Sequence, residues 1–223
     1  MRHGSVVNRP AQEALYAAFT STVRRRLERR SMLMNLIATQ NEVTVKNLLT
    51  AFESESNAHA KYMAYAAKAD SEGLRETAGL LRSIARSEQI HANNHARVIR
   101  QLGGEPDANL QSIDVKTTME NLAAALGDEI YEIESMYPRF LMENRRSDNS
   151  AARTLAWARD AERTHARFLA EEIRRIETGK ANSSVDVKTD FYVRSVCGCV
   201  SKTREPERCW ACDRFCASFE TVR

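Results

Sequence analysis

Two copies of a short motif, Glu-x-x-His, are the residues in this sequence best suited to metal chemistry. The first copy is Glu88 with His91, and the second is Glu162 with His165. On a helix, residues three apart share a face, so each copy presents a carboxylate and an imidazole in one direction. Carboxylates are oxygen ligands that bridge cations, and imidazole suits iron, zinc or copper. Two such pairs facing each other therefore predict a two-metal site inside a helix bundle.

A single glutamate precedes each copy of the motif at the same distance. Glu55 lies 33 residues before Glu88, and Glu129 lies 33 residues before Glu162. The equal spacing indicates an internal repeat of two helical hairpins. Glu132, three residues after Glu129, adds a carboxylate on the same helical face. Since a dry core does not hold several unpaired carboxylates, we expect these glutamates to surround a pair of iron or manganese ions.

Two tyrosines and two further histidines fall near these positions. Tyr62 and Tyr137 have spacings that place them beside the glutamates, and we expect their hydroxyls to donate to carboxylates and orient them. His59 lies one turn after the first glutamate and is expected to pack beside the site. His95 lies one turn beyond the first motif and is expected to reach solvent.

Four helices must position these residues. Apolar residues recur at spacings of three, four and seven over about 43–69, 74–102, 117–146 and 150–178. Pro138 falls inside the third span and is expected to kink it. The polar connection between the second and third helices is long, whereas the other two are short. This pattern predicts an all-α fold, a ferritin-like four-helix bundle with one long crossover.

Composition limits the classes of function. The chain has 223 residues, of which 43% are hydrophobic and 28% charged, as in ordinary globular proteins. A net charge of +3 is too small to indicate nucleic acid as a partner, and no run of 18 apolar residues predicts a membrane span. All five cysteines cluster near the C-terminus and no secretory signal is visible, which indicates metal binding in a reducing compartment. We therefore expect a cytoplasmic protein.

The N-terminal region differs from the rest of the chain. Residues 1–31 carry seven arginines against two acids. We assign 1–40 to a basic extension, disordered or partly helical; an organelle transit peptide and an extension upstream of a natural start at Met32 or Met34 are the alternatives. The bundle is assigned to 41–179, a polar linker to 180–190 and a small cysteine-rich β domain to 191–223.

The segments that carry these candidate residues resemble the rubrerythrin family. The similarity extends over about residues 43–220 and is strongest at 47–56, 85–92, 131–138 and 161–166. The segment 131–138, which ends in Met-Tyr-Pro, is more specific to the family than Glu-x-x-His. The resemblance implies that a di-iron centre is held by seven residues, all of them present: Glu55, Glu88, His91, Glu129, Glu132, Glu162 and His165.

The same resemblance implies a peroxidase. Its expected reaction is reduction of hydrogen peroxide to water by electrons from the diferrous centre. His91 and Glu132 would exchange at one iron between redox states, with Tyr62 and Tyr137 beside the site. The resemblance also implies an electron-donor protein of rubredoxin or flavoprotein-reductase type. It further implies a homodimer in which the cysteine domain of one chain lies near the di-iron site of the other.

The cysteine-rich end departs from the family pattern. Family members end in a rubredoxin-like domain whose two Cys-x-x-Cys turns hold one iron. The second turn is present here as Cys209 to Cys212, but Arg194 stands where the first turn should begin, so that only Cys197 of that turn remains. The matched thiolates are therefore three rather than four.

A replacement ligand is available in the sequence. Cys199 is two residues after Cys197, and in an extended chain the two side chains point the same way. Cys216 is a weaker candidate. Three outcomes are open: an iron site that uses Cys199, a three-cysteine site completed by water or holding zinc instead of iron, and a metal-free domain.

Two other functions are compatible with the same residues. One is an iron-detoxifying ferroxidase, which would need no electron-input domain. The other is a non-enzymatic sensor in which the cysteine thiols respond to peroxide. NADH-coupled turnover, mineral build-up and the effect of Cys-to-Ser changes distinguish the three.

Overall fold

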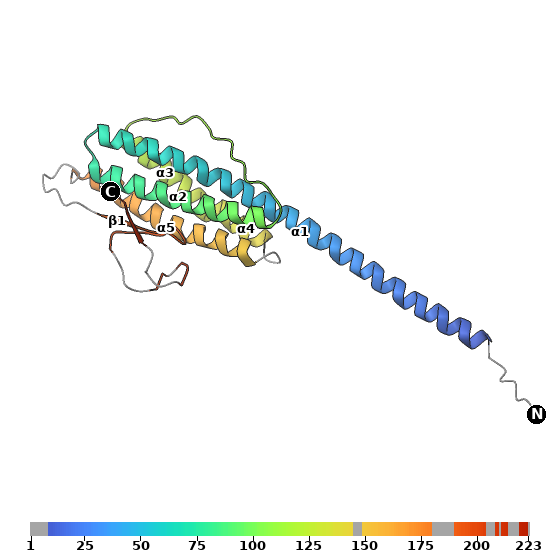
Figure 1. Cartoon of the computed structure of the whole chain (residues 1–223). Coiled ribbons are helices and arrows are strands. Elements are labelled where there is room, and N and C mark those ends of the chain that lie inside the picture. Colours follow the sequence, from blue (N-terminus) through green and yellow to red (C-terminus); the bar gives the residue numbers. More distant parts are fainter. Residues whose placement is uncertain are drawn as a thin grey trace, which may run out of the picture. The chain divides into compact units, whose positions relative to one another are not determined.

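A computed structural model describes residues 9–144, 149–179, 190–203, 208–209, 211–213 and 219–222. The chain divides into two compact units, residues 1–42 and 43–223. Its elements, in chain order, are α1 (Arg9–Ser71), α2 (Arg75–Gln101), α3 (Thr118–Tyr131), η1 (Glu132–Met136), α4 (Tyr137–Glu143), α5 (Asn149–Glu177), β1 (Phe191–Arg194), β2 (Val200–Ser201) and β3 (Phe219–Val222) (Figure 1).

The described part of the first unit is the N-terminal stretch of α1. The expected start of this helix near Val43 is wrong, because α1 begins at Arg9 and continues through the basic segment. The described side chains from Arg24 to Thr39 are exposed, and Arg24 pairs with Glu28 one turn later at 2.9 Å. Arginine and glutamate favour helix without tertiary contacts, which accounts for a helix over a stretch with so little apolar periodicity.

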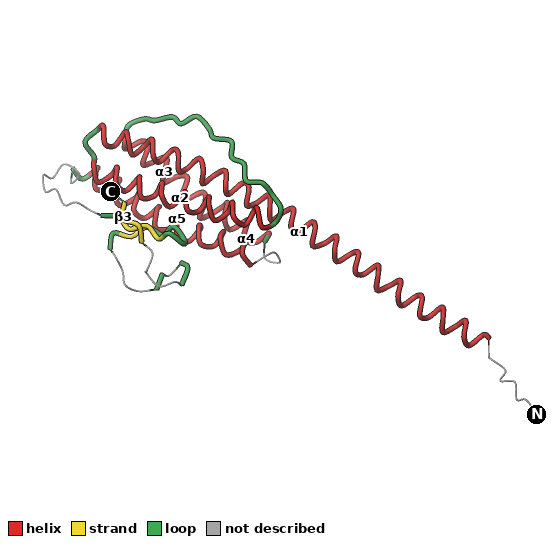
Figure 2. The backbone as a smooth tube through the Cα atoms, in the orientation of Figure 1, coloured by secondary structure: helices red, strands yellow, loops and turns green. Residues whose placement is uncertain are grey.

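The second unit contains the predicted bundle. The part of α1 from Val43 onward, α2, the run α3–η1–α4 and α5 lie side by side, and the prediction of a ferritin-like bundle is confirmed (Figure 1). The connection between α2 and α3, residues 102–117, is the long crossover, and it runs along the outside of the bundle (Figure 2). Among the described residues, no helix is long and apolar enough to cross a membrane.

Two apolar clusters fill the bundle. One includes Leu81, Ile84 and Leu122, and the other includes Leu48 and Leu155. Along α1 the residues of the second cluster come first and those of the first cluster follow, and Glu55 falls between them. The apolar layers thus support the helices on both sides of the polar layer in which the site is built.

The third predicted helix is interrupted in an informative way. It begins at Thr118, where the Thr117 side chain and Glu120 form a capping box, and it passes through a π-helical turn, η1, before it continues as α4. Pro138 lies in the first turn of α4, where its missing N–H is tolerated. The predicted disturbance at Pro138 is therefore a π-turn immediately before it.

The C-terminal region from Asp190 onward, called the cysteine segment below, forms an antiparallel sheet in the order β2-β1-β3. Phe191, Val193 and Val200 belong to the same apolar cluster as the bundle core. Arg86 of α2 also binds Glu220 of β3 through two hydrogen bonds of 2.6 and 2.7 Å. The segment therefore packs directly on the helices that carry the site. The expected linker, 180–190, lies outside the described residues except for its last residue.

Candidate metal centre

Four glutamates and two histidines meet in the middle of the bundle. All six side chains are buried, with exposures of 2% or less. Their ligand atoms form two overlapping groups, each with its members within 4.8 Å of one another. These six residues, called the carboxylate cluster below, are Glu55, Glu88, His91, Glu129, Glu162 and His165.

The overlap between the two groups shows what each residue can do. Glu88 and Glu162 belong to both groups, whereas Glu55 belongs only to the group of His91, and Glu129 only to that of His165. Each position thus has one imidazole and one glutamate of its own, and two glutamates are shared. Two shared carboxylates between two such positions suit a pair of cations bridged by oxygen ligands.

Several ligand atoms of the carboxylate cluster have no hydrogen-bond partner among the described residues. Glu55 Oε2, Glu129 Oε2 and both Glu162 oxygens are buried without a hydrogen-bond partner among the described residues. His165 Nδ1 lies 2.6 Å from Glu162 Oε2, yet the pair lacks hydrogen-bond geometry. Buried unpaired polar atoms are costly, and cations between them remove that cost. The donor set therefore fits the metal pair.

The electrostatics of the carboxylate cluster lead to the same conclusion. Burial and repulsion from Glu162 and Glu88 raise the pKa of Glu55 to about 8. Burial and repulsion from Glu162 and Glu88 also raise the pKa of Glu129. Against burial, the nearby Glu88 and Glu162 hold the pKa of His165 well above its usual range. So much negative charge in a dry layer is the arrangement that divalent cations neutralise.

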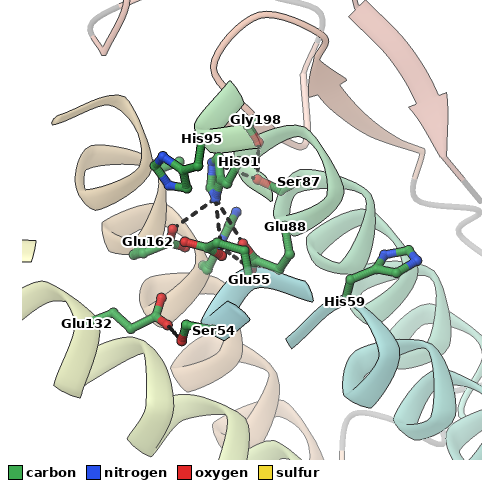
Figure 3. A network of polar contacts seen from close by, with 12 residues as sticks. Ser54, Glu55, His59, Ser87, Glu88, His91, His95, Glu132, Glu162 and Gly198 are labelled. Carbon is green, nitrogen blue, oxygen red and sulfur yellow. Dashed lines mark hydrogen bonds and ion pairs between the residues drawn. The ribbon is translucent and has the colours of Figure 1, made fainter. Parts of the chain in front are cut away.

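His91 is held from both sides of its ring (Figure 3). Its Nδ1 faces the carboxylates, at 2.9 Å from Glu88 and 3.0 Å from Glu162. Its Nε2 lies 3.0 Å from the backbone carbonyl oxygen of Cys197 and therefore donates to it. A proton fixed on Nε2 leaves Nδ1 of the neutral ring free to bind a metal.

Glu132 lies beside the carboxylate cluster without belonging to either group among the described residues. Ser54 donates a hydrogen bond of 2.6 Å to its Oε1 (Figure 3). Burial and repulsion from Glu55 raise the pKa of Glu132 well above its usual range. In this structure His91 therefore faces the shared glutamates while Glu132 is held back on a serine.

Both tyrosines reach the glutamates that belong to one group only. Tyr62 of α1 donates a hydrogen bond of 2.8 Å to Glu129, and Tyr137 donates one to Glu55. Each hydroxyl thus fixes a carboxylate from another helix. Tyr137 lies 75 residues after Tyr62, one residue more than the repeat of 74 that relates the motifs. Tyr137 comes five residues after Glu132, a spacing that a π-turn places on one face.

The expectation for His95 was wrong. The side chain is fully buried, with Nε2 3.2 Å from the Tyr137 hydroxyl and Nδ1 3.2 Å from Thr154 Oγ1. Burial, with a smaller contribution from His91, lowers the pKa of His95 to about 3, so the ring is neutral. His95 lies one turn after His91 on an inward face, and that spacing is the signal that the sequence offered. His59, half-buried, instead contacts the carbonyl oxygen of Ala85 at 2.7 Å, away from the carboxylate cluster (Figure 3).

The cysteine segment lies against the bundle of its own chain. Besides the contact of Cys197 with His91, Ser87 of α2 donates to the carbonyl oxygen of Gly198 at 2.6 Å, and Asn94 donates to Val196 at 2.9 Å. The homodimer implied by the resemblance, with the cysteine domain of one chain near the di-iron site of the other, stays a prediction. In this structure the chain's own cysteine segment contacts α2 of its bundle.

The predicted cysteine ligands separate into two sets. The sulfurs of Cys197, Cys199 and Cys209 lie within 4.8 Å of one another and are buried. Cys212 is half-buried and packs beside them, but it is not part of that group of described residues. Cys216 lies outside the described residues. The sequence left Cys199 as an alternative; the structure brings it into the cluster and leaves Cys212 at its edge.

Comparison with known proteins shows which family the chain belongs to. Residues 46–173 match the sequence profile of the Rubrerythrin family. The chain is a member of the rubrerythrin family. Rubrerythrin-2 of Clostridium acetobutylicum is 28% identical over 178 residues, which is 79% of this chain and 95% of that protein. Nigerythrin of Nitratidesulfovibrio vulgaris is 30% identical over 178 residues, or 77% of this chain and 82% of that one.

Solved structures agree with the family assignment. A structure of nigerythrin in a mixed-valence state superposes with a TM-score of 0.70 at 27% identity, covering 80% of this chain and 86% of the other. Membership of the rubrerythrin family and the paired donor groups identify the protein as a di-iron oxidoreductase with a ferritin-like fold.

Proposed function

We propose that the protein is a peroxidase that reduces hydrogen peroxide to water. The residues that would hold the metal pair are the six of the carboxylate cluster, with Glu132 in reserve. When bound, the iron pair supplies the two electrons that the reaction needs, by redox chemistry rather than by polarising water. The protein must then bring electrons in, accommodate the change in iron charge and supply protons.

The observation that carries the proposal is the hydrogen bond between His91 and Cys197. It joins a candidate metal ligand to the backbone of a cysteine that belongs to the thiol cluster, at 3.0 Å. A ferroxidase does not need such a contact. An enzyme that is re-reduced by a partner protein needs a covalent and hydrogen-bonded route from its surface domain to the buried site, and this contact completes one. A donor of rubredoxin or flavoprotein-reductase type fits this entry point.

The proposal includes an exchange of Glu132 and His91 as ligands of one iron. A more oxidised pair of cations favours an added carboxylate, whereas a reduced pair needs fewer negative ligands. Glu132 is buried beside the cluster and accepts a hydrogen bond from Ser54. His91 is restrained by the Cys197 carbonyl in the opposite direction. Each side chain thus has a defined place when it is not a ligand.

Protons have a buried route on the other side of the cluster. Tyr137 donates to Glu55, His95 Nε2 donates to the Tyr137 hydroxyl, and Thr154 contacts His95 Nδ1. Because His95 is neutral, its protonated nitrogen is the one that faces the tyrosine. The chain therefore holds a proton at the Tyr137 oxygen, one hydrogen bond from a carboxylate of the cluster.

The test compares peroxide turnover with iron oxidation. We expect the fully reduced protein to consume one hydrogen peroxide for every two electrons, and to sustain NADH-coupled turnover with a suitable reductase. Ferrous iron oxidised in excess of two per chain, with mineral build-up, would instead support a ferroxidase. Absence of metal after careful iron reconstitution would contradict both the peroxidase and the ferroxidase function.

A variant pair tests the exchange. Glu132→Gln removes the reserve carboxylate, and its matched control Glu134→Gln changes an exposed glutamate two residues away. We expect the first to lower turnover by roughly 10–100-fold with two irons still bound, and the second to leave it unchanged. Equal turnover in the two variants would contradict the role given to Glu132.

A further inference from the structure

The cysteine segment keeps the backbone of a metal-binding turn at a place where its first ligand is missing. In the intact turn, the N–H of Asp213 donates to the carbonyl oxygen of Cys209 at 2.7 Å, and Asp213, the last residue of the turn, has a positive φ of 53°. In the altered turn, Gly198 N–H donates to Arg194 carbonyl oxygen at 2.9 Å, and Gly198 has a φ of 80°. The two turns therefore match in their closing hydrogen bond and in their left-handed last residue.

The Arg194 side chain is used elsewhere. Its guanidinium carbon lies 4.4 Å from the centre of the Phe219 ring, and Phe219 is the partner of Arg194 across the β1–β3 pair. A guanidinium is permanently charged and has no acceptor, so it cannot replace a thiolate at a metal. The family's own set of four ligands is thus not available in this chain.

Strand pairing supplies a thiol at the equivalent place. Tyr192 pairs with Ser201 and Val193 with Val200, so the next pair along the hairpin is Arg194 with Cys199. The hydrogen bond from Arg194 N–H to Cys199 carbonyl oxygen, 3.0 Å, continues that register. Directly opposite residues of an antiparallel pair share a face, with Cβ atoms about 4.5–5.5 Å apart. A ligand lost at 194 is therefore regained from across the hairpin at 199.

The three sulfurs lie within 4.8 Å of one another, close enough to share one ion. Cys197 Sγ lies 3.7 Å from Cys209 Sγ. Around a tetrahedral ion with metal–sulfur bonds of about 2.3 Å, sulfurs lie about 3.8 Å apart.

We propose that Cys197, Cys199 and Cys209 form a three-thiolate site for a soft divalent cation such as Zn²⁺ or Fe²⁺, with Cys199 as the cross-strand substitute for the ligand missing at 194. Cys212 is not a ligand in this site. The described residues provide three corners of a tetrahedron, and the fourth is left for a further ligand. Because the Cys197 carbonyl accepts from His91, occupancy of this site also fixes the position of the peptide above the carboxylate cluster.

The test is titration of the metal-free, full-length protein with Co²⁺. Sulfur-to-cobalt charge-transfer absorption reports thiolate ligation alone, because the carboxylate cluster contains no sulfur. We expect the wild type to show this absorption, and Cys199→Ser to weaken Co²⁺ binding at the thiolate site by roughly 10–100-fold or more. Cys212→Ser, the matched control in the intact turn, should retain the affinity within about twofold.

The opposite pattern would overturn the proposal: loss of the absorption in Cys212→Ser and its retention in Cys199→Ser. A wild type without thiolate absorption would overturn it as well. The double change Arg194→Cys with Cys199→Ser separates ligand loss from misfolding, because it rebuilds the family pattern and should restore the absorption. A folded double variant that stays without it would contradict the cross-strand exchange. Two irons bound by the carboxylate cluster in every variant show that the proposed peroxidase site is unaffected, so the two proposals fail independently.

Discussion

The carboxylate cluster and the cysteine segment show two ways of holding metal ligands. In the carboxylate cluster each of the six donors projects from a helix between two apolar layers. In the cysteine segment Cys197 and Cys199 lie on the β1–β2 hairpin, and one position of the family pattern has changed to Arg194. On a helix the nearest alternative ligand lies one turn away on the same face, as Glu132 does relative to Glu129. On a hairpin it lies on the opposite strand, because the residue opposite shares the same face. The two regions therefore draw a substitute ligand from different directions, along one element or across two.

The largest effect is expected from a change in the carboxylate cluster. Glu162→Gln removes a carboxylate that belongs to both groups, so both metal positions lose a ligand at once. We expect iron content to fall from about two per chain to less than about one, with affinity lowered by more than roughly 100-fold, since even groups one shell farther out contribute 10–100-fold. Metal analysis after reconstitution measures this.

The matched control for this change is Glu177→Gln, an exposed glutamate on the same helix. It should bind iron like the wild type. If Glu162→Gln also retained both irons, the shared role assigned to it would be wrong.

The next effect lies at the junction of the two regions. A Cβ on Gly198 would lie 2.3 Å from His91 Nε2 and 2.5 Å from Ser87 Oγ, so Gly198→Ala must displace the cysteine segment or the imidazole. We expect a loss of about 1–3 kcal/mol beyond the backbone strain, and slower reduction by a donor protein. Thermal unfolding and stopped-flow reduction are the measurements.

Gly103→Ala is the control that isolates the contact. Its φ of +83° is close to the +80° of Gly198, but its Cβ would meet no described atom within 4 Å. Both variants share the strain of a left-handed residue, and only one pushes on His91. Equal losses of stability and reduction rate would show that the junction does not matter.

The third prediction concerns pH and the metal-free protein. The pKa of Glu55 is about 8 in the fold against an ordinary 4.5, and the pKa of His91 and His165 is raised as well, after the opposing effect of burial, by nearby glutamates. All three groups hold more protons folded than unfolded, so stability should fall as pH rises from about 5 to about 8. Each pKa unit corresponds to about 1.4 kcal/mol, and we expect the Tm to drop by several degrees.

Two comparisons sharpen this prediction. Glu55→Gln should flatten the pH dependence of the metal-free Tm, whereas Cys199→Ser should leave it intact. With iron bound, the dependence should reverse, because protons compete with the metal for the same carboxylates. A metal-free Tm that rises over the same range would refute the assignment.

The smallest effect is expected where the cysteine segment is tied to α2 at the surface. The side chains of Arg86 and Glu220 are 31% and 41% exposed and bind through two hydrogen bonds. We expect Glu220→Gln to cost no more than about 1 kcal/mol and to leave iron binding unchanged, because exposed ion pairs contribute little. Denaturant unfolding at low and high salt measures it; a loss above about 2 kcal/mol would mean that this pair is essential to docking.

Much of the carboxylate cluster could be predicted from the sequence. Glu55, Glu88, Glu129 and Glu162 are related by a repeat, and helical spacing converts sequence distance directly into a shared face. The four-helix order followed from the same periodicity and from the length of the crossover. Where the members of a site repeat at one fixed spacing on successive helices, spacing alone was sufficient.

The remaining features depend on contacts between distant segments. His95 was expected in solvent because the sequence does not show that Tyr137 and Thr154 face it from two other helices. The place of Cys199 depends on the register of a hairpin, which the turn fixes and composition does not reveal. The early start of α1 rests on local propensity, which carries little apolar periodicity to detect.

The π-turn η1 has a consequence for the whole third helix. It inserts the equivalent of one residue into the helical repeat, so the residues before and after it follow different phases. Glu129 keeps the phase of α3, while Tyr137 keeps the phase of α4, and both still face the same buried layer. Deleting one residue between Glu132 and Met136 would restore a regular helix and rotate Tyr137 by about 100° away from Glu55. A single extra residue therefore lets both Glu129 and Tyr137 of one helix point into the same site.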